Sequence, residues 1–218
     1  AVPHVGEEIH FYIAIPKKWS EVASKQIQGL WNGASVEGVS DDYTIFNAQG
    51  TSVAAYVRQE ERYVLPVRTY QEFDADSFGA ILGSFAKVNE VGEGAALQCV
   101  VRPAPAKTKG EIRKTIDLLK RGASLKDILA RSLLDAFKSF GKTVRGEKEK
   151  EEKVVDEQAI KALEEKISKP LFEVNIRLLA SAGSPFQAND ILEGLAAGLE
   201  QFAAPERNAL TVVKPKQA

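Results

Sequence analysis

The clearest alternation of apolar and polar residues lies in the last third of the chain. Residues 171–179, with the sequence LFEVNIRLL, alternate at period two and predict a strand. The turn Gly183-Ser184-Pro185 follows, apolar residues then recur at helical spacing from 191 to 202, and a β-branched run ends at 210–213. This order predicts a βαβ unit. Two strands are too few for a stable sheet, so we expect this unit to borrow an edge from the first lobe, from another copy or from further sequence.

A similar order of patterns opens the chain. The apolar run at 10–15 predicts a strand that ends at Pro16, which cannot donate a ladder hydrogen bond. The helix that follows is expected to lie on a sheet because its apolar residues share one side. These residues are Trp19, Val22, Ala23, Ile27, Leu30 and Trp31.

Further strands are predicted between this helix and residue 101. They cover residues 35–39, 43–46, 52–57 and 63–67, of which the last two flank the charged tip 58–62 and suggest a hairpin. Asp74 or Asp76 is expected to cap a second helix with Phe78, Ile81, Leu82, Phe85 and Val88 on its apolar face, and a last strand covers 95–101.

The middle of the chain has helical periodicity only. Residues 107–140 predict a hairpin of two helices, broken at Arg121-Gly122-Ala123, with Ser124 capping the second helix. The expected inward residues are Ile112, Ile116 and Leu119 in the first helix and Leu125, Ile128, Leu129, Leu133 and Phe137 in the second. The stretch 141–156 is dominated by Glu and Lys and is interpreted as a solvated linker. A helix with Ile160, Leu163 and Ile167 on one side then leads into the C-terminal βαβ unit.

These patterns together predict an α+β protein with several parts. We expect a ferredoxin-like sandwich lobe at 7–105, a helical hairpin inserted at 106–141, a charged linker at 142–155 and a second, smaller αβαβ lobe at 156–215.

Composition and charge narrow the function classes. The chain has 218 residues, of which 44% are hydrophobic and 27% charged, as in ordinary globular proteins. Its formal charge of -1 and pI of about 6.3 provide no global basic field for nucleic acid or anionic membranes, so any such contact is local. The absence of methionine is consistent with a processed or partial chain.

Two further features concern compartment and membrane. The single cysteine, Cys99, lies in an apolar run and is predicted to be a small buried residue; a lone cysteine fits a reducing compartment. No segment approaches the ~18 apolar residues of a membrane span, and the start of the chain lacks the pattern of a signal peptide.

The candidate chemical motifs are weak. Residues 136–143 match a relaxed phosphate loop that includes Lys142, but a helix precedes them where a strand is needed. His4 and His10, with Glu7 and Glu8 between them, lack the further ligands of a metal site. The acidic pairs Asp41-Asp42 and Asp74/Asp76 lie where turns or helix caps account for them. We therefore predict no catalytic, cofactor-binding or metal-binding residue.

Nucleic-acid recognition by a sheet remains an alternative. An RNA-reading sheet displays aromatic residues and cations on adjacent strands. Phe11 with Tyr12, and Arg102 with Arg177, offer these residue types on or beside predicted strands, although neither neighbourhood matches an RNA-binding motif.

Several strings resemble one known family. They are Gly92–Gln98 leading to Val101–Ala104, the segment Lys169–Ala182, and the helix Ile191–Phe202 followed by Pro205 and Asn208. They resemble the region ahead of the motor in predicted type IV secretion or conjugative DNA-transfer ATPases from uncultivated bacteria. The match covers roughly residues 8–213. In that family a membrane-proximal segment precedes this region and a RecA-like ATPase follows it.

The resemblance implies a non-catalytic role. We expect a cytoplasmic assembly or adaptor domain, at the inner face of the membrane, that positions the motor against a membrane complex. Its partners would be the ATPase motor, channel subunits or a second copy of itself, with DNA contacted only indirectly and no cofactor. The alternative is a free-standing ferredoxin-like binding module for RNA or a small ligand.

Overall fold

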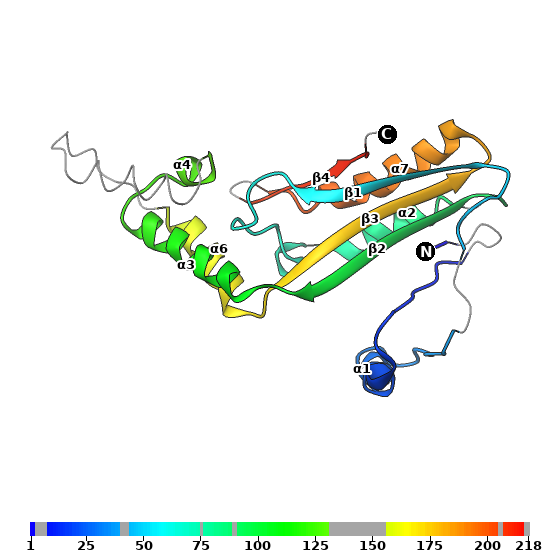
Figure 1. Cartoon of the computed structure of the whole chain (residues 1–218), viewed down its shortest axis with the longest axis horizontal. Coiled ribbons are helices and arrows are strands. Elements are labelled where there is room, and N and C mark those ends of the chain that lie inside the picture. The colour runs from blue at the N-terminus through cyan, green and yellow to red at the C-terminus, as the bar shows by residue number, and fades with distance from the viewer. Residues whose placement is uncertain are drawn as a thin grey trace.

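Strands from both ends of the chain meet in one four-stranded antiparallel sheet. The computed structural model describes residues 1–2, 8–39, 44–74, 76–88, 91–130, 156–204 and 207–215. Within them, the strand order is β2-β3-β1-β4, and every neighbouring pair is antiparallel (Figure 1). The strands are β1 (Thr51–Gln59), β2 (Gly94–Pro103), β3 (Phe172–Ala182) and β4 (Leu210–Val213).

The C-terminal βαβ unit completes its sheet with strands from the first half. β3 lies between β2 and β1, and β4 pairs with the other side of β1. The C-terminal unit was expected to borrow a sheet edge from the first lobe, from another copy or from further sequence, and the structure shows that the first lobe provides it. The two predicted lobes share one sheet, because an isolated pair of strands leaves too much backbone and apolar surface in water.

Two helices cover one face of this sheet. α7 (Pro185–Glu200) packs against β3 and β1, and α2 (Ser77–Phe85) packs against α7. Both helices begin at capping side chains: Asp76 accepts a hydrogen bond from the Phe78 amide, and Ser184 accepts one from the Gln187 amide. Asp76 is thus the cap of the two predicted candidates.

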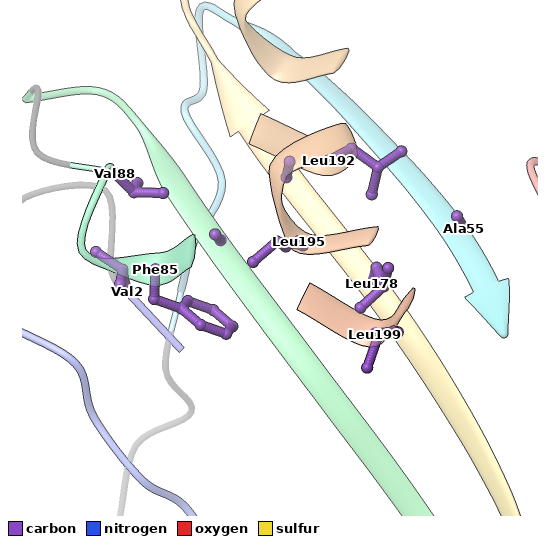
Figure 2. Close-up of a cluster of buried hydrophobic side chains, with 10 residues drawn as sticks. Val2, Ala55, Phe85, Val88, Leu178, Leu192, Leu195 and Leu199 are labelled. Carbon is purple, nitrogen blue, oxygen red and sulfur yellow. The ribbon is translucent and has the colours of Figure 1, made fainter. Parts of the chain in front are cut away.

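The main core lies between these helices and the sheet. Leu178 of β3 lies opposite Ala55 of β1 and Leu97 of β2, so that the three share the face that α7 covers. Leu192, Leu195 and Leu199 approach this face from α7, while Val2 joins Phe85 and Val88 near the start of β2 (Figure 2). The predicted inward faces are confirmed at Phe85 of α2 and at these three leucines of α7, and Val88, which follows α2, is buried as predicted. Phe78 of α2 was also predicted to face inward, and this was wrong because its side chain is 53% exposed.

A second core lies in three helices beyond one end of the sheet (Figure 1). α3 (Ala106–Lys120) packs against α6 (Glu157–Ser168), and the short α4 (Leu125–Ala130) follows a turn in which Gly122 has a φ of 83°. The buried residues match the predicted periodicity; they include Ile112, Ile116, Leu119, Ile128, Ile160 and Leu163. Residues 131–155, which hold the rest of the predicted hairpin and most of the charged linker, lie outside the described residues.

The N-terminal segment differs from its prediction. Residues 10–15 form no strand, and the helix α1 (Ser20–Leu30), preceded by the 3-10 turn Lys17–Trp19, has no buried residue. The helix itself was predicted, but its packing on a sheet was wrong: α2 and α7 already occupy the helix-covered face. We call residues 8–39 the arm; Figure 1 shows α1 set apart from the sheet.

Three other predicted strands are also absent from the described residues. Residues 35–39 and the described part of 43–46, residues 44–46, belong to no strand, and 63–67 is a turn-rich loop instead of the second strand of a hairpin. β-branched and aromatic residues favour a strand only where a neighbouring backbone can pair with them. Here β1 pairs with β3 and β4, so no edge of β1 is left for 63–67. The 3-10 turn Tyr70–Glu72 follows this loop.

Candidate interaction surfaces

The residues considered and set aside as metal or phosphate ligands are described only in part. His10 and Glu8 form an exposed pair, with 3.6 Å between Nε2 and Oε2, while His4, Glu7 and Asp41-Asp42 lie outside the described residues. No group of three His, Cys, Asp or Glu side chains able to hold a metal ion occurs in the part of the chain that the structure describes. Lys142 and residues 136–143 also lie outside it.

Cys99 is exposed, so its predicted burial was wrong. Its register opposite Ile176 places it on the helix-covered face of the sheet. α7 runs over β3 and β1, and α2 packs on α7, so the far half of β2 on this face is left uncovered. The partial burial that remains raises the pKa of the thiol.

An uncovered strip of apolar residues continues beside Cys99. Val101 and Pro103 of β2 lie opposite Val174 and Phe172 of β3, on the same face. Val101 is 55% exposed and Phe172 56%. The sheet therefore shows apolar surface on its helix-covered side, next to the second core.

The opposite face of the sheet carries a polar row. Tyr56 of β1, Arg177 of β3 and Gln98 of β2 lie side by side in register. Arg177 donates hydrogen bonds to Asn175 Oδ1 at 2.8 Å and to Gln98 Oε1 at 3.3 Å. The shallow depression along this row has a volume of about 310 Å³ and is lined by Ala54, Ala55, Tyr56, Asn175, Arg177, Leu179 and Pro215.

Of the residues considered for nucleic-acid recognition, only Arg177 belongs to this row. Arg102 lies further along β2 in an exposed ion pair with Glu173, at 2.6 Å. Phe11 and Tyr12 lie on the arm, where Phe11 is 6.0 Å from Phe78 between ring centroids. Tyr56 escaped the sequence reasoning because its position beside Arg177 depends on a pairing between strands more than a hundred residues apart.

The arm exposes the densest group of large apolar side chains. Trp19 is 54% exposed, Leu30 72% and Trp31 63%. Val22 and Leu30 lie on the side of α1 that continues from Trp19, the residue directly before the helix. Lys17 and Lys18 precede this helix, and the Lys18 ammonium lies 5.6 Å from the Trp19 ring centroid. This amphipathic helix has its apolar face in solvent.

A polar joint connects the sheet to the second core. Asn208 is fully buried and bonds to the backbone of loop residues 61–65, which carries Val64 into the helical core. Arg62 donates to the Ile128 carbonyl of α4 at 3.2 Å, and Lys166 of α6 donates to the carbonyls of Tyr63 and Leu65. Burial lowers the pKa of the Lys166 ammonium to about 8. The joint therefore fixes α3, α4 and α6, which we call the helical extension, to the sheet.

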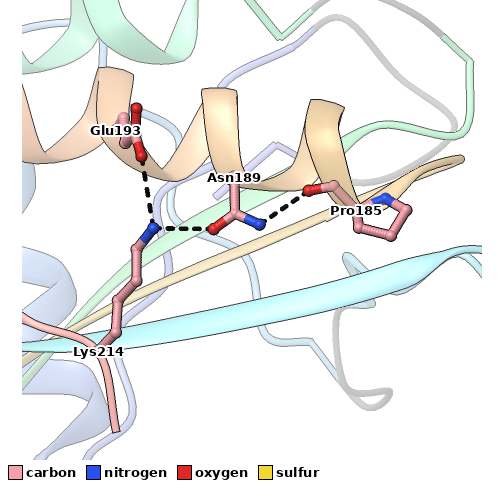
Figure 3. A network of polar contacts seen from close by, with 4 residues as sticks. All are labelled: Pro185, Asn189, Glu193 and Lys214. Carbon is pink, nitrogen blue, oxygen red and sulfur yellow. Dashed lines mark hydrogen bonds and ion pairs between the residues drawn. The ribbon is translucent and has the colours of Figure 1, made fainter.

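A smaller polar network holds the end of β4. Lys214 donates to Asn189 Oδ1 at 2.9 Å and forms an ion pair with Glu193 at 3.4 Å, while Asn189 donates to the Pro185 carbonyl (Figure 3). All these contacts are exposed, so they position the chain after β4 on α7 and contribute little free energy.

Comparison with known families gives one match. The model of the family described as "Domain of unknown function (DUF8128)" matches residues 3–214. The chain belongs to this family. The DUF8128 match covers all four strands, α2 and α7, the three helices of the second core and the arm.

The other comparisons return nothing for this DUF8128 domain: no curated protein matches it, and neither does any solved structure. Among its described helices, none combines the length and apolar character that crossing a bilayer requires.

Proposed function

We propose that this DUF8128 domain is a non-catalytic assembly domain of a type IV secretion-like, conjugative DNA-transfer ATPase. It positions the motor against a membrane complex at the inner, cytoplasmic face of the membrane, and DNA is contacted only through the motor. The observation that carries this proposal is the arm: its largest apolar side chains lie in solvent, outside both cores. Exposed apolar patches of this kind are typical of protein interaction sites.

The fold is proposed to be a ferredoxin-like sandwich with an insertion. The units β1-α2-β2 and β3-α7-β4, with strand order β4-β1-β3-β2, follow the βαββαβ arrangement. α3, α4 and α6 interrupt it between β2 and β3. Such an insertion leaves the sandwich intact and extends the surface beyond its end.

The arm fits the mode in which an amphipathic helix enters an apolar groove. Trp19, Val22 and Leu30 would enter the groove, and Lys17 and Lys18 would meet carboxylates at its rim. Burying a side chain of this size contributes ~1.5–3 kcal/mol, and tryptophan is frequent among the residues that dominate binding energy. We propose that this groove lies on the ATPase motor, so that α1 holds the motor. The sandwich and the helical extension would then contact the membrane complex.

The test uses the two tryptophans, which both lie in the arm. Titration of the purified motor into the full chain should shift the tryptophan emission to shorter wavelength as the arm is buried. The double variant Trp19→Ala/Leu30→Ala should bind at least about tenfold more weakly, a loss of ~1.4 kcal/mol. Phe186→Ala, on α7 and 81% exposed, is the matched control. Equal affinity for the arm variant and the control would refute the assignment.

A non-catalytic role also predicts that the chain alone does not bind ATP. Calorimetry should detect no heat of nucleotide binding. Micromolar binding that disappears in Lys142→Ala would contradict this proposal and restore the phosphate-loop interpretation of residues 136–143.

The second candidate is RNA binding on the open face of the sheet. It is favoured by Tyr56 and Arg177, an aromatic residue and a cation on the two central strands. Fluorescence anisotropy with a labelled single-stranded RNA distinguishes the candidates. Salt-sensitive binding that is lost in Tyr56→Ala, with the arm variant unaffected, supports RNA binding; no binding at micromolar concentration excludes it.

A further inference from the structure

The helical extension is basic although the chain as a whole is not. Residues 106–130 contain seven Lys or Arg against three Asp or Glu, a net charge of +4, whereas the whole chain has -1. Exposed charges more than ~8–10 Å apart are largely screened at physiological salt, so a partner at α3 responds to these local charges and not to the total. The local contact with an anion that the net charge left open therefore has a place in the fold.

Four cations share the side of α3 that is turned away from the second core. Lys107, Lys114 and Arg121 recur every seven residues, close to two helical turns, and Arg113 adjoins Lys114. All four are exposed, while the five buried residues of α3 lie on its other side. A rise of 1.5 Å per residue spreads the four over ~21 Å. We call them the basic face.

The basic face is unpaired in the described part of the chain. Lys120, on the side towards α6, forms an ion pair with Glu164 at 2.6 Å, but no ion pair or side-chain hydrogen bond involves any of the four cations. Of the two acids of α3, Glu111 accepts a hydrogen bond from Tyr63, and Asp117 lies among the cations on the outer side. The four charges are therefore available to an anionic partner.

The stability of α3 does not account for these cations. The N-terminus of a helix carries partial positive charge and favours acids, yet the first turn contains Lys107 and Lys109 and no acid. Lys109 and Arg113 are also like charges at positions i and i+4, which destabilise a helix. A local conflict of this kind is expected where residues serve binding instead of folding.

The chemistry of the basic face fits a membrane surface better than a macromolecular partner. Single-stranded nucleic acids stack their bases on aromatic side chains, and α3 contains none. Protein interfaces have an apolar core, whereas the large apolar residues of α3 are buried in the second core. A bilayer with anionic headgroups requires neither feature, because mobile phosphates in a plane can meet unpaired cations along one straight helix.

We propose that the basic face of α3 binds the anionic lipid headgroups of the inner face of the membrane. The contact is electrostatic, with ammonium and guanidinium groups meeting lipid phosphates and no apolar side chain of α3 entering the bilayer. Figure 1 shows α3 well apart from α1, so the lipid and the motor do not compete for one surface. This inference rests on the proposed function for the location at the membrane, but its test reads α3 and lipid, whereas motor binding is read through α1.

Flotation of the full chain with lipid vesicles tests the contact. At ~0.1 M salt the chain should float with vesicles of phosphatidylcholine and phosphatidylglycerol but not with phosphatidylcholine alone, and at ~1 M salt, where the Debye length is ~3 Å, it should no longer float. Each cation near an anionic membrane contributes about fivefold to the partition coefficient, equivalent to ~1 kcal/mol. Arg113→Ala/Lys114→Ala should therefore bind about 25-fold more weakly. Asp117→Asn, which removes the acid from the same side, should bind about fivefold more tightly.

Lys161→Ala/Lys169→Ala is the matched control. Both lysines are exposed and lie in α6 or at its end, and neither forms an ion pair in the described chain. The control removes the same amount of charge as the α3 variant but leaves the basic face intact, so it should bind like the unmodified chain. The α3 variant should keep its urea midpoint, because alanine is the best helix former.

Several results would overturn the lipid assignment. They are the absence of flotation with anionic vesicles, an equal loss in the α3 variant and the control, or binding that survives ~1 M salt. The emission of the two tryptophans, which both lie in the arm, should stay unchanged on vesicles; a shift to shorter wavelength would show that the arm inserts instead. A DNA duplex that displaces the chain from vesicles at equal phosphate concentration would assign the basic face to nucleic acid and would equally exclude this proposal.

Discussion

Replacing Asn208 with alanine tests whether one buried side chain holds the joint between the sheet and the helical extension. Its Oδ1 accepts hydrogen bonds from the amides of Glu61, at 2.9 Å, and Ala209, at 3.0 Å. Its Nδ2 faces the carbonyls of Glu61, Arg62 and Leu65 at 3.1, 3.0 and 3.3 Å. The side chain thus pairs with backbone groups of a loop that has no ladder of its own.

The expected loss in the free energy of unfolding follows from the number of hydrogen bonds that Asn208 makes and from their burial. Nδ2 has two hydrogens, so the amide makes about four hydrogen bonds at a time. Each polar group left buried without a partner costs ~1–3 kcal/mol, and water that enters the vacated volume recovers part of it. We expect Asn208→Ala to lower the free energy of unfolding by ~3–5 kcal/mol, a large share of a typical domain's ~5–15 kcal/mol.

Urea unfolding followed by circular dichroism measures this loss. Asn189→Ala is the matched control, because Asn189 bonds only at the exposed surface of α7 (Figure 3), and it should change the stability by less than ~0.5 kcal/mol. Hydrogen exchange should also accelerate at the amides of Glu61 and Ala209 in Asn208→Ala. A loss below ~1 kcal/mol, with those amides still protected, would refute the claim that this side chain holds the joint.

Three further changes test the cores and the joint. Gly94→Ala should destabilise the fold severely, since the added Cβ would lie 2.2 Å from the Ile45 carbonyl oxygen. In contrast, the Cβ added by Gly110→Ala in α3 meets nothing within 4 Å, and this variant should be stabilised by up to ~1 kcal/mol. A soluble Gly94→Ala protein with an unchanged urea midpoint would contradict the close approach. Leu195→Ala should cost ~2–5 kcal/mol in urea unfolding if its face of α7 is core, and a negligible loss means that the face was misassigned. The pKa of Lys166 is lowered from 10.5 to about 8, so between these pH values the unfolded chain binds one proton more than the folded chain. The free energy of unfolding should therefore rise from pH 8 to 10.5, by ~1–3 kcal/mol. This rise should be absent in Lys166→Met, and equal pH profiles for the two proteins would exclude burial of this ammonium.

The elements that the sequence predicted well are those with one clear apolar side, which packs on a core. The alternation of 171–179 and the helical spacing from 191 to 202 appear as β3 and α7, and Asp76 caps α2 as one of two named candidates. Ile112, Ile116 and Leu163 are buried as their periodicity indicated. In each case the local spacing alone decides which side chains leave water.

The interaction surfaces were less accessible to sequence reasoning. Residues 10–15 and 63–67 have strand propensity, yet neither forms a strand in the described chain. The exposure of Cys99 and Val101 depends on where α7 ends its cover of the sheet, and the row of Tyr56 beside Arg177 depends on register. None of these features can be predicted from a local sequence pattern.

The amino-acid sequence by itself determined which segments are helical, which have strand propensity and which of their sides are apolar, because these follow from the 3.6- and two-residue periods of the backbone. Only the tertiary structure decided that β3 enters between β1 and β2 and that Asn208 bonds to a distant loop. The reason is that pairing and burial are settled by competition among all segments for a limited number of edges and faces, so strand propensity, as at 63–67, does not by itself place a segment in the sheet.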